Sequence, residues 1–223
     1  MDTLLLTPEG KKELMSLKND NKETIGSDLM ESNAGCTANV GLIYKNTLYV
    51  ANAGDSRCLL ASKKDIVSMS NDHKPDSDIE KTRIVKAGGF VLDGRMNSNL
   101  NLSRALGDLE YKKNPAIGVD EQLIIAVPDI KTYQINDKTD FILLGCDGVW
   151  ETMSNSDIVD FIYDHLKKGT DLKIIVENLL DKLIATDTFS KIFSFFDNLG
   201  GNYIVLRRSG MRQYDHDFGS FPK

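Results

Sequence analysis

Residues 141–151 (Phe-Ile-Leu-Leu-Gly-Cys-Asp-Gly-Val-Trp-Glu) combine an apolar run of strand length with an abrupt end at Asp147-Gly148. A strand that is buried on both faces has a continuous apolar sequence, so we expect residues 140–146 to lie inside a sheet. Asp147 would then stand at the rim of that sheet, where a carboxylate can hold a cation, and Gly148 would let the backbone turn sharply beside it. The alternative stays open, because Asp-Gly is also an ordinary turn sequence.

The composition limits the classes of function. The chain has 223 residues, of which 41% are hydrophobic and 27% charged, as is usual for a single globular domain. Its net charge of -6 disfavours binding to nucleic acid and suits divalent cations. No apolar run approaches the ~20 residues of a membrane span. The 3 cysteines lie far apart, which predicts neither a zinc site nor disulfides and indicates a cytoplasmic or nuclear protein.

The hydrophobic patterns predict strands first and helices late. Strands are expected at residues 36–44, 47–53, 57–61, 90–92, 123–127, 130–135, 140–146 and 202–207. Helices are expected at residues 78–87, from Ser154 or Ser156 to the residue before Gly169, and at 172–184. Antiparallel hairpins followed by helices predict the α+β class, as an antiparallel β-sandwich flanked by helices.

Acidic residues recur at glycine turns. Asp55 follows Gly54, Asp108 follows Gly107, and Asp147 precedes Gly148. Hard divalent cations such as Mg²⁺ and Mn²⁺ prefer oxygen ligands, so these turns are candidate metal sites. The sequence contains no Walker-type phosphate loop and no nucleophile elbow, and its 3 histidines are isolated, which gives a histidine-centred triad little support.

Several short segments occur in a characteristic order. They are Gly-Cys-Thr-Ala-Asn-Val at 35–40, Val-Ala-Asn-Ala-Gly-Asp-Ser-Arg at 50–57, Asp-His-Lys-Pro at 72–75, Asn-Leu-Ser-Arg-Ala-Leu-Gly-Asp at 101–108 and Cys-Asp-Gly-Val-Trp at 146–150. In this order they resemble the metal-dependent protein phosphatases of type 2C, in particular the gamma-like branch. The resemblance covers roughly residues 35–207 and implies two packed antiparallel sheets flanked by helices. It also implies that a water activated by two Mg²⁺ or Mn²⁺ ions hydrolyses phosphoserine and phosphothreonine in phosphoproteins.

The resemblance also assigns roles to single residues. Asp147 matches the core metal ligand of the family, Asp55 matches an acid of a weaker metal position, and Glu151 falls where a further acid of that position stands. The candidates for bracing a loop or facing the substrate are Arg57, Ser103, Arg104, Asp108 and Gly148. For Arg104 the alternative to a substrate contact is an ion pair with a neighbouring acid that braces the loop.

Two departures from the family pattern stand out. Residues 1–34 contain neither the Asp-Gly-His-Gly metal motif nor the phosphate-binding arginine that the family has upstream of its Gly-Cys-Thr segment. The final motif, Gly-x-Asp-Asn in the family, has Gly201 in the aspartate position, with Asp197 as a nearby acid that could replace it. We therefore expect a polar linker or partly ordered entry at 1–34, an incomplete phosphatase-like domain at 35–208 that lacks its N-terminal strands, and a loose tail at 209–223.

Three functions remain open from the sequence. The first is a metal-dependent protein serine/threonine phosphatase in an N-terminally truncated form with impaired activity. The second is a non-catalytic phosphatase-like domain that binds phosphoproteins or a partner. The third is a different Mg²⁺-dependent phosphoesterase, whose activity would survive loss of Asp147. We expect a monomer with a phosphoprotein substrate and with neither nucleic acid nor a membrane as partner.

Overall fold

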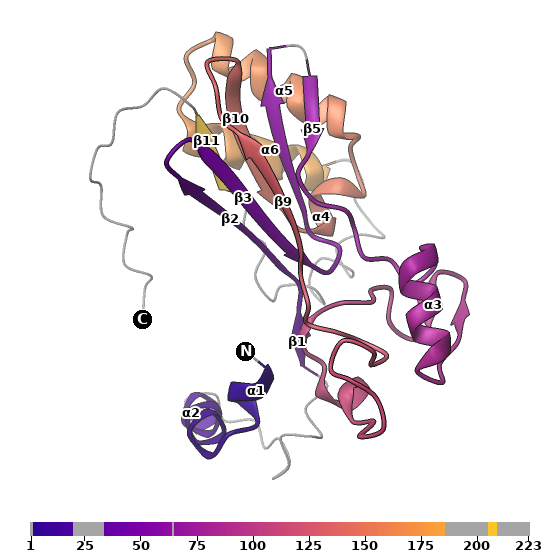
Figure 1. The fold of residues 1–223 in the computed structure, drawn as a ribbon. Coiled ribbons are helices and arrows are strands. Elements are labelled where there is room, and N and C mark those ends of the chain that lie inside the picture. Colours follow the sequence, from indigo (N-terminus) through magenta and orange to yellow (C-terminus); the bar gives the residue numbers. More distant parts are fainter. Residues whose placement is uncertain (1, 20–33, 64, 186–204, 209–223) are drawn as a thin grey trace.

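A computed structural model describes residues 2–19, 34–63, 65–185 and 205–208. Two antiparallel sheets pack against each other, and a region of loops and short elements around helix α3 lies at one end of them (Figure 1). The α+β class and the sandwich of antiparallel sheets with helices, as predicted, are confirmed. Within the described ranges no helix is long and apolar enough to cross a bilayer.

The two sheets differ in size. The larger has the order β11-β10-β4-β5, formed by Val205–Arg208, Thr139–Gly145, Arg57–Ser62 and Asp65–Ser68. The smaller has the order β2-β3-β9, formed by Ala38–Tyr44, Thr47–Ala53 and Asp129–Gln134. All neighbouring strands in both sheets are antiparallel.

The remaining elements are helices and short strand pairs. The helices are α1 (Asp2–Leu5), α2 (Pro8–Asn19), α3 (Asp78–Lys86), α4 (Asp147–Trp150), α5 (Asn155–Lys167), α6 (Leu172–Ala185) and the 3-10 helix η2 (Leu109–Lys112). The short pairs are β1 (Gly35–Cys36) with β8 (Leu106–Gly107), and β6 (Val91–Leu92) with β7 (Arg95–Met96).

Residues 141–145 of strand β10 are apolar because both faces of the strand are covered. Phe141 and Leu143 on one face pack with buried residues of α5 and α6. Ile142 on the other face packs with Leu48 and Val50 of β3, between the two sheets. The continuous apolar run in the sequence therefore reflects a strand in the middle of a three-layer arrangement of helices, large sheet and small sheet.

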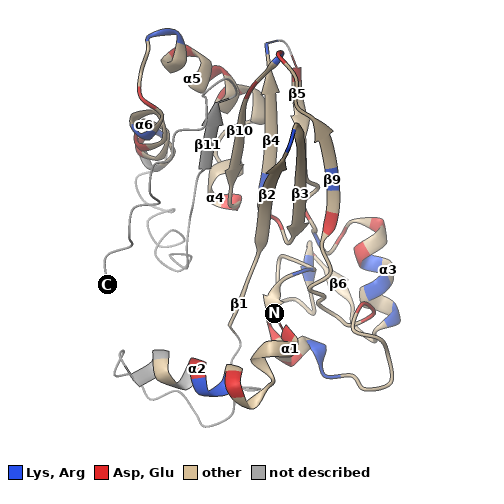
Figure 2. Cartoon of the chain, turned by 60° about the vertical axis from the view of Figure 1, so that its left-hand side comes forward, with Lys and Arg blue, Asp and Glu red and all other residues tan. Residues whose placement is uncertain are grey.

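The outer face of the small sheet presents apolar side chains. Val40, Leu42 and Ile130 are 59%, 60% and 65% exposed. Strands β2 and β3 carry no charged residue, in contrast to the helices (Figure 2). This face contributes little buried area within the described part of the chain, so its side chains contribute little to the stability of that part.

Some element predictions were wrong. Residues 123–127 form no strand and make only a single parallel bridge, between Ile125 and Arg104. Ile124 packs in a small core with Ile84 of α3, and Ile125 is also buried, which explains the apolar pattern without a ladder. The strand predicted at 36–44 is divided into β1 and β2, and β5 was missed. Residues 202–204 of the last predicted strand and the tail at 209–223 lie outside the described residues.

The fold predicts a contrast between two leucines in strands. Leu143→Ala removes a fully buried side chain, so we expect it to lower the free energy of unfolding by about 2–5 kcal/mol. Leu42→Ala is the matched control on the exposed face, and we expect a change within about 0.5 kcal/mol. Urea unfolding of both variants measures the difference. Equal losses would show that the outer face of the small sheet is buried in solution.

Candidate functional site

The pairing of β4 with β10 brings two acids to one end of the large sheet. Gly145 of β10 lies opposite Arg57 of β4 in this antiparallel pair. Asp147 follows Gly145 by two residues and Asp55 precedes Arg57 by two, so both acids leave the strand pair at the same end. The two carboxylates are close enough to interact electrostatically. The register therefore joins two acids that lie far apart in the sequence.

Asp147 is the first residue of α4 and is half-buried. Its Oδ1 accepts a hydrogen bond from the Gly148 N–H at 2.8 Å. Burial and the nearby negative charge of Asp55 raise the pKa of Asp147, and the ammonium group of Lys74 partly opposes this rise. Two carboxylates in one partly buried position repel each other, and a shared cation would relieve that repulsion.

Asp55 is buried and has its own counter-ion. Its carboxylate is 4% exposed and its Oδ2 forms an ion pair with Lys74 Nζ. The next residue, Ser56, is held by a 2.7 Å hydrogen bond between its Oγ and Thr37 Oγ1. Lys74 therefore supplies the positive charge that a buried carboxylate requires when it lies beside another acid.

Arg57 braces the site. Its guanidinium donates to both carboxylate oxygens of Asp72, at 3.0 and 2.8 Å, and to Asn155 Oδ1 at 2.5 Å. The same group lies 5.3 Å from the ring centroid of Trp150, whose indole N–H donates to Gly145 O at 2.8 Å. Arg57 thereby links β4 to the start of α5 and to the short helix that carries Asp147.

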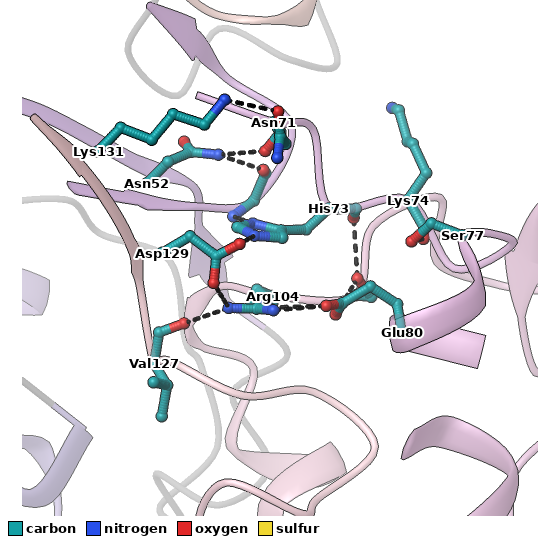
Figure 3. A network of polar contacts seen from close by, with 12 residues as sticks. Asn52, Asn71, His73, Lys74, Ser77, Glu80, Arg104, Val127, Asp129 and Lys131 are labelled. Atoms are coloured by element: carbon teal, nitrogen blue, oxygen red, sulfur yellow. Dashed lines mark hydrogen bonds and ion pairs between the residues drawn. The ribbon is translucent and has the colours of Figure 1, made fainter. Parts of the chain in front are cut away.

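A buried ionic network lies beside this end of the sheet (Figure 3). Glu80 Oε1 accepts from Arg104 Nε at 3.0 Å and from Arg104 Nη2 at 2.6 Å, and Oε2 accepts from Arg83 Nη1 at 2.6 Å. Ser103 Oγ lies 2.7 Å from Oε2. Burial alone would raise the pKa of Glu80, but the hydrogen bonds from Arg104, Ser103 and Arg83 outweigh it and hold the pKa below its usual value.

Arg104 extends the network to the small sheet. Its Nη1 donates to Asp129 Oδ1 at 2.8 Å and to Val127 O at 3.0 Å. Asp129 Oδ2 lies 3.2 Å from His73 Nε2. Burial raises the pKa of Asp129, but the bonds from His73 and Arg104 outweigh it and lower the pKa overall. Arg104 is engaged on both sides by acids, which is the bracing arrangement left open from the sequence.

The remaining candidates lie apart from this acidic pair or at its rim. Asp108 is buried beside the β1–β8 pair, and a Cβ at Gly35 would lie 2.2 Å from its Oδ2, so the glycine makes room for it. Burial raises the pKa of Asp108. Glu151 is exposed at the end of α4, four residues after Asp147 and therefore on the same side of that helical turn.

Three residues that make polar contacts at the site were assigned no role from the sequence. Lys74 and His73 belong to the quoted Asp-His-Lys-Pro segment, but nothing in the sequence pairs them with the Gly54-Asp55 turn. Glu80 lies in a helix with mixed charges, where an acid is normally solvated. The neighbouring Asp-His-Lys segment was the signal that could have indicated the first two.

Removing the charge of Asp147 should stabilise the metal-free protein. In Asp147→Asn the repulsion from Asp55 disappears, so we expect Tm in EDTA to rise by about 2–4 °C, which corresponds to about 1 kcal/mol. Asp160→Asn, on the exposed face of α5, is the control and should leave Tm unchanged. Differential scanning calorimetry measures both. A fall in Tm for Asp147→Asn would contradict the repulsion.

The lowered pKa of Glu80 predicts a pH dependence. The ionised form stabilises the fold above the unfolded pKa of about 4.3, and this contribution is lost as the pH falls through the lower folded pKa. We expect Glu80→Gln to destabilise the protein by about 3–5 kcal/mol at pH 7 and by less below about pH 4. Glu177→Gln in α6, an exposed control, should change stability by less than about 1 kcal/mol. Denaturant titrations of the wild type and Glu80→Gln at pH 7 and pH 3.5 test this. A difference in the free energy of unfolding that is as large at pH 3.5 as at pH 7 would contradict it.

Comparisons with known proteins give the family. The chain matches the family model "Protein phosphatase 2C" over residues 7–192. It is 55% identical over 192 residues to "Probable protein phosphatase 2C 2" of Paramecium tetraurelia, covering 84% of this chain and 62% of that protein. It is 51% identical over 212 residues to "Protein phosphatase 2C 1" of the same organism, covering 93% and 68%.

A solved structure shows the same likeness. A phosphatase from Toxoplasma gondii superimposes with a TM-score of 0.60 at 33% sequence identity, over 64% of this chain and 45% of that chain. The chain spans 62% of the length of the first Paramecium relative. The family match covers most of the chain, and the chain therefore belongs to the protein phosphatase 2C family.

Proposed function

We propose that this chain provides the catalytic domain, or most of it, of a protein phosphatase that removes phosphate from phosphoserine and phosphothreonine with the help of a divalent cation. One observation supports this above the others: the register of β4 and β10 places Asp55 and Asp147 together at one end of the large sheet. Family membership supplies the reaction class.

The residues at this end of the sheet fit a divalent cation. The protein phosphatase 2C family is generally dependent on Mg²⁺ or Mn²⁺. Asp55 and Asp147 offer carboxylate oxygens, which are the ligands that both ions prefer, and Mg²⁺ completes its shell with several waters. Their mutual repulsion supports the fit, because a cation between them would replace an unfavourable interaction with a favourable one.

The residues of the chain would each have a distinct task. Asp147 and Asp55 would hold the cation, and Glu151, one helical turn after Asp147, would add negative charge at the exposed rim. Lys74 neutralises Asp55 in the absence of the cation. Arg57 fixes the start of β4 against α5 and so keeps the two acids in register. When bound, the metal would supply a water of lowered pKa as nucleophile and would stabilise charge on the phosphoryl oxygens.

One observation favours a second function. Among the described residues no group of three or more His, Cys, Asp or Glu side chains is placed to hold a metal ion. Asp197 and Gly201, at the altered final motif, lie outside the described residues. A site with fewer carboxylates binds a hard cation more weakly, which favours the non-catalytic domain that binds phosphoproteins or a partner. For either function we propose a phosphoprotein ligand and a monomeric protein.

Phosphate release distinguishes the two functions. We expect the protein to hydrolyse a phosphothreonine peptide with Mn²⁺ and to lose this activity in EDTA. Loss of a residue that only supports a metal ligand typically lowers activity by about 10- to 100-fold. In Asp147→Asn the rate should fall by more than this, whereas Asp160→Asn should keep the wild-type rate. Peptide binding without turnover would favour the non-catalytic domain. Turnover that survives Asp147→Asn would contradict the assignment and favour the other phosphoesterase.

A further inference from the structure

Side-chain contacts join the segment 72–74 to the segment 54–57. Asp72 forms an ion pair with Arg57, and Lys74 forms one with Asp55. His73, between them, contacts Gly54. The segment 72–74 therefore lies along the turn that presents Asp55, and each of its side chains engages that turn or the first residue of β4.

The turn at Gly54 can be formed only by a residue without a side chain. Its φ is +116°, and a Cβ there would lie 2.5 Å from Thr37 Cγ2. His73 holds both backbone polar groups of this glycine. Its backbone N–H donates to Gly54 O at 3.0 Å, and its ring Nδ1 accepts from the Gly54 N–H at 3.1 Å. Asn52 Nδ2 donates to the same carbonyl oxygen at 3.0 Å.

These contacts determine the state of the His73 ring. Because Nδ1 accepts a hydrogen bond, it carries no proton, and the proton of the neutral ring lies on Nε2, which faces Asp129 Oδ2 at 3.2 Å. Asp129 is fixed in turn by Arg104, which donates from both Nε and Nη2 to Glu80 Oε1 (Figure 3). The ring is 4% exposed, so the protein and not solvent sets its orientation.

A further contact fixes the backbone of His73. Its carbonyl oxygen accepts from the Ser103 N–H at 3.0 Å, and Ser103 Oγ lies 2.9 Å away. The buried network of Glu80, Arg104 and Ser103 therefore contacts His73 through Ser103. His73 in turn contacts Gly54, the residue before Asp55. The contacts therefore form a connected path from the buried network to the turn that presents Asp55.

We propose that His73 is a positioning residue for Asp55. Its neutral ring holds the Gly54 N–H through Nδ1 and so fixes the direction in which the next residue presents its carboxylate to a divalent cation. This inference rests on the proposed function, which makes Asp55 a ligand of that cation. It agrees with the general behaviour of residues that orient metal ligands, whose loss lowers metal affinity by about 10- to 100-fold.

Two substitutions separate the two hydrogen bonds of the ring. In His73→Asn the amide oxygen can take the place of Nδ1 and accept from the Gly54 N–H, but the bond to Asp129 is lost. In His73→Gln the longer side chain can donate to Asp129 from the position of Nε2, but it has no acceptor at the position of Nδ1. His165→Gln in α5, where the ring contacts the Phe161 carbonyl oxygen, is the control.

Two measurements on the full chain test the proposal. Calorimetric titration with Mn²⁺ should show about tenfold weaker binding for His73→Gln and a loss within about threefold for His73→Asn. Hydrogen exchange by NMR should show that the Gly54 amide exchanges faster in His73→Gln than in His73→Asn. Equal Mn²⁺ affinities in the two variants, or equal protection of the Gly54 amide, would overturn the proposal even if both variants had a lower Tm.

The exchange measurement also separates this proposal from the proposed function. If the wild-type chain binds no Mn²⁺, the metal-dependent function fails. Slower exchange of the Gly54 amide in His73→Asn than in His73→Gln would still show that the hydrogen bond from the Gly54 N–H to His73 Nδ1 stabilises the turn. Equal exchange in the two variants would overturn that too. The His165→Gln control should match the wild type in both measurements.

Discussion

The antiparallel register of β4 and β10 is the constraint on which the site depends. Gly145 pairs with Arg57, so the residues that follow β10 and those that precede β4 lie at the same end of the sheet. This brings Asp147 close to Asp55. A shift of one residue would turn every side chain of β10 to the other face and bury the wrong set against α5 and α6. The packing of Phe141 and Leu143 therefore fixes the register of β10, and the register fixes the positions of Asp147 and Asp55.

Charge balance is the second requirement at this end of the sheet. Two partly or fully buried carboxylates lie together, and the protein offsets part of their repulsion with Lys74. The Glu80–Arg104–Asp129 network beside them is different, because its acids are already paired with Arg104 and the pKa values of Glu80 and Asp129 are lowered. We infer that the first group retains capacity for an added cation and that the second group serves as a fixed support for it.

The sequence predicted the parts of this arrangement that depend on local pattern. The apolar run before Asp147, the glycine turn at Asp55 and the α+β class were visible because strand burial and turn formation are local properties. The partners of Glu80 and His73 were not visible, since they depend on long-range contacts between α3, the loop at 103–104 and β9. The strand predicted at 123–127 was wrong for the same reason: burial of Ile124 against Ile84 of α3 gives the same apolar pattern as a strand.

A double-mutant cycle of Asp55→Asn and Asp147→Asn tests most directly whether the register joins the two acids. Urea unfolding in EDTA gives the free energy of unfolding of the wild type, both single variants and the double variant. The structure predicts a coupling of about 0.5–3 kcal/mol, with the gain from Asp147→Asn largely lost once Asp55 is neutral. Additive effects, within about 0.5 kcal/mol, would contradict it by showing that the two carboxylates do not interact.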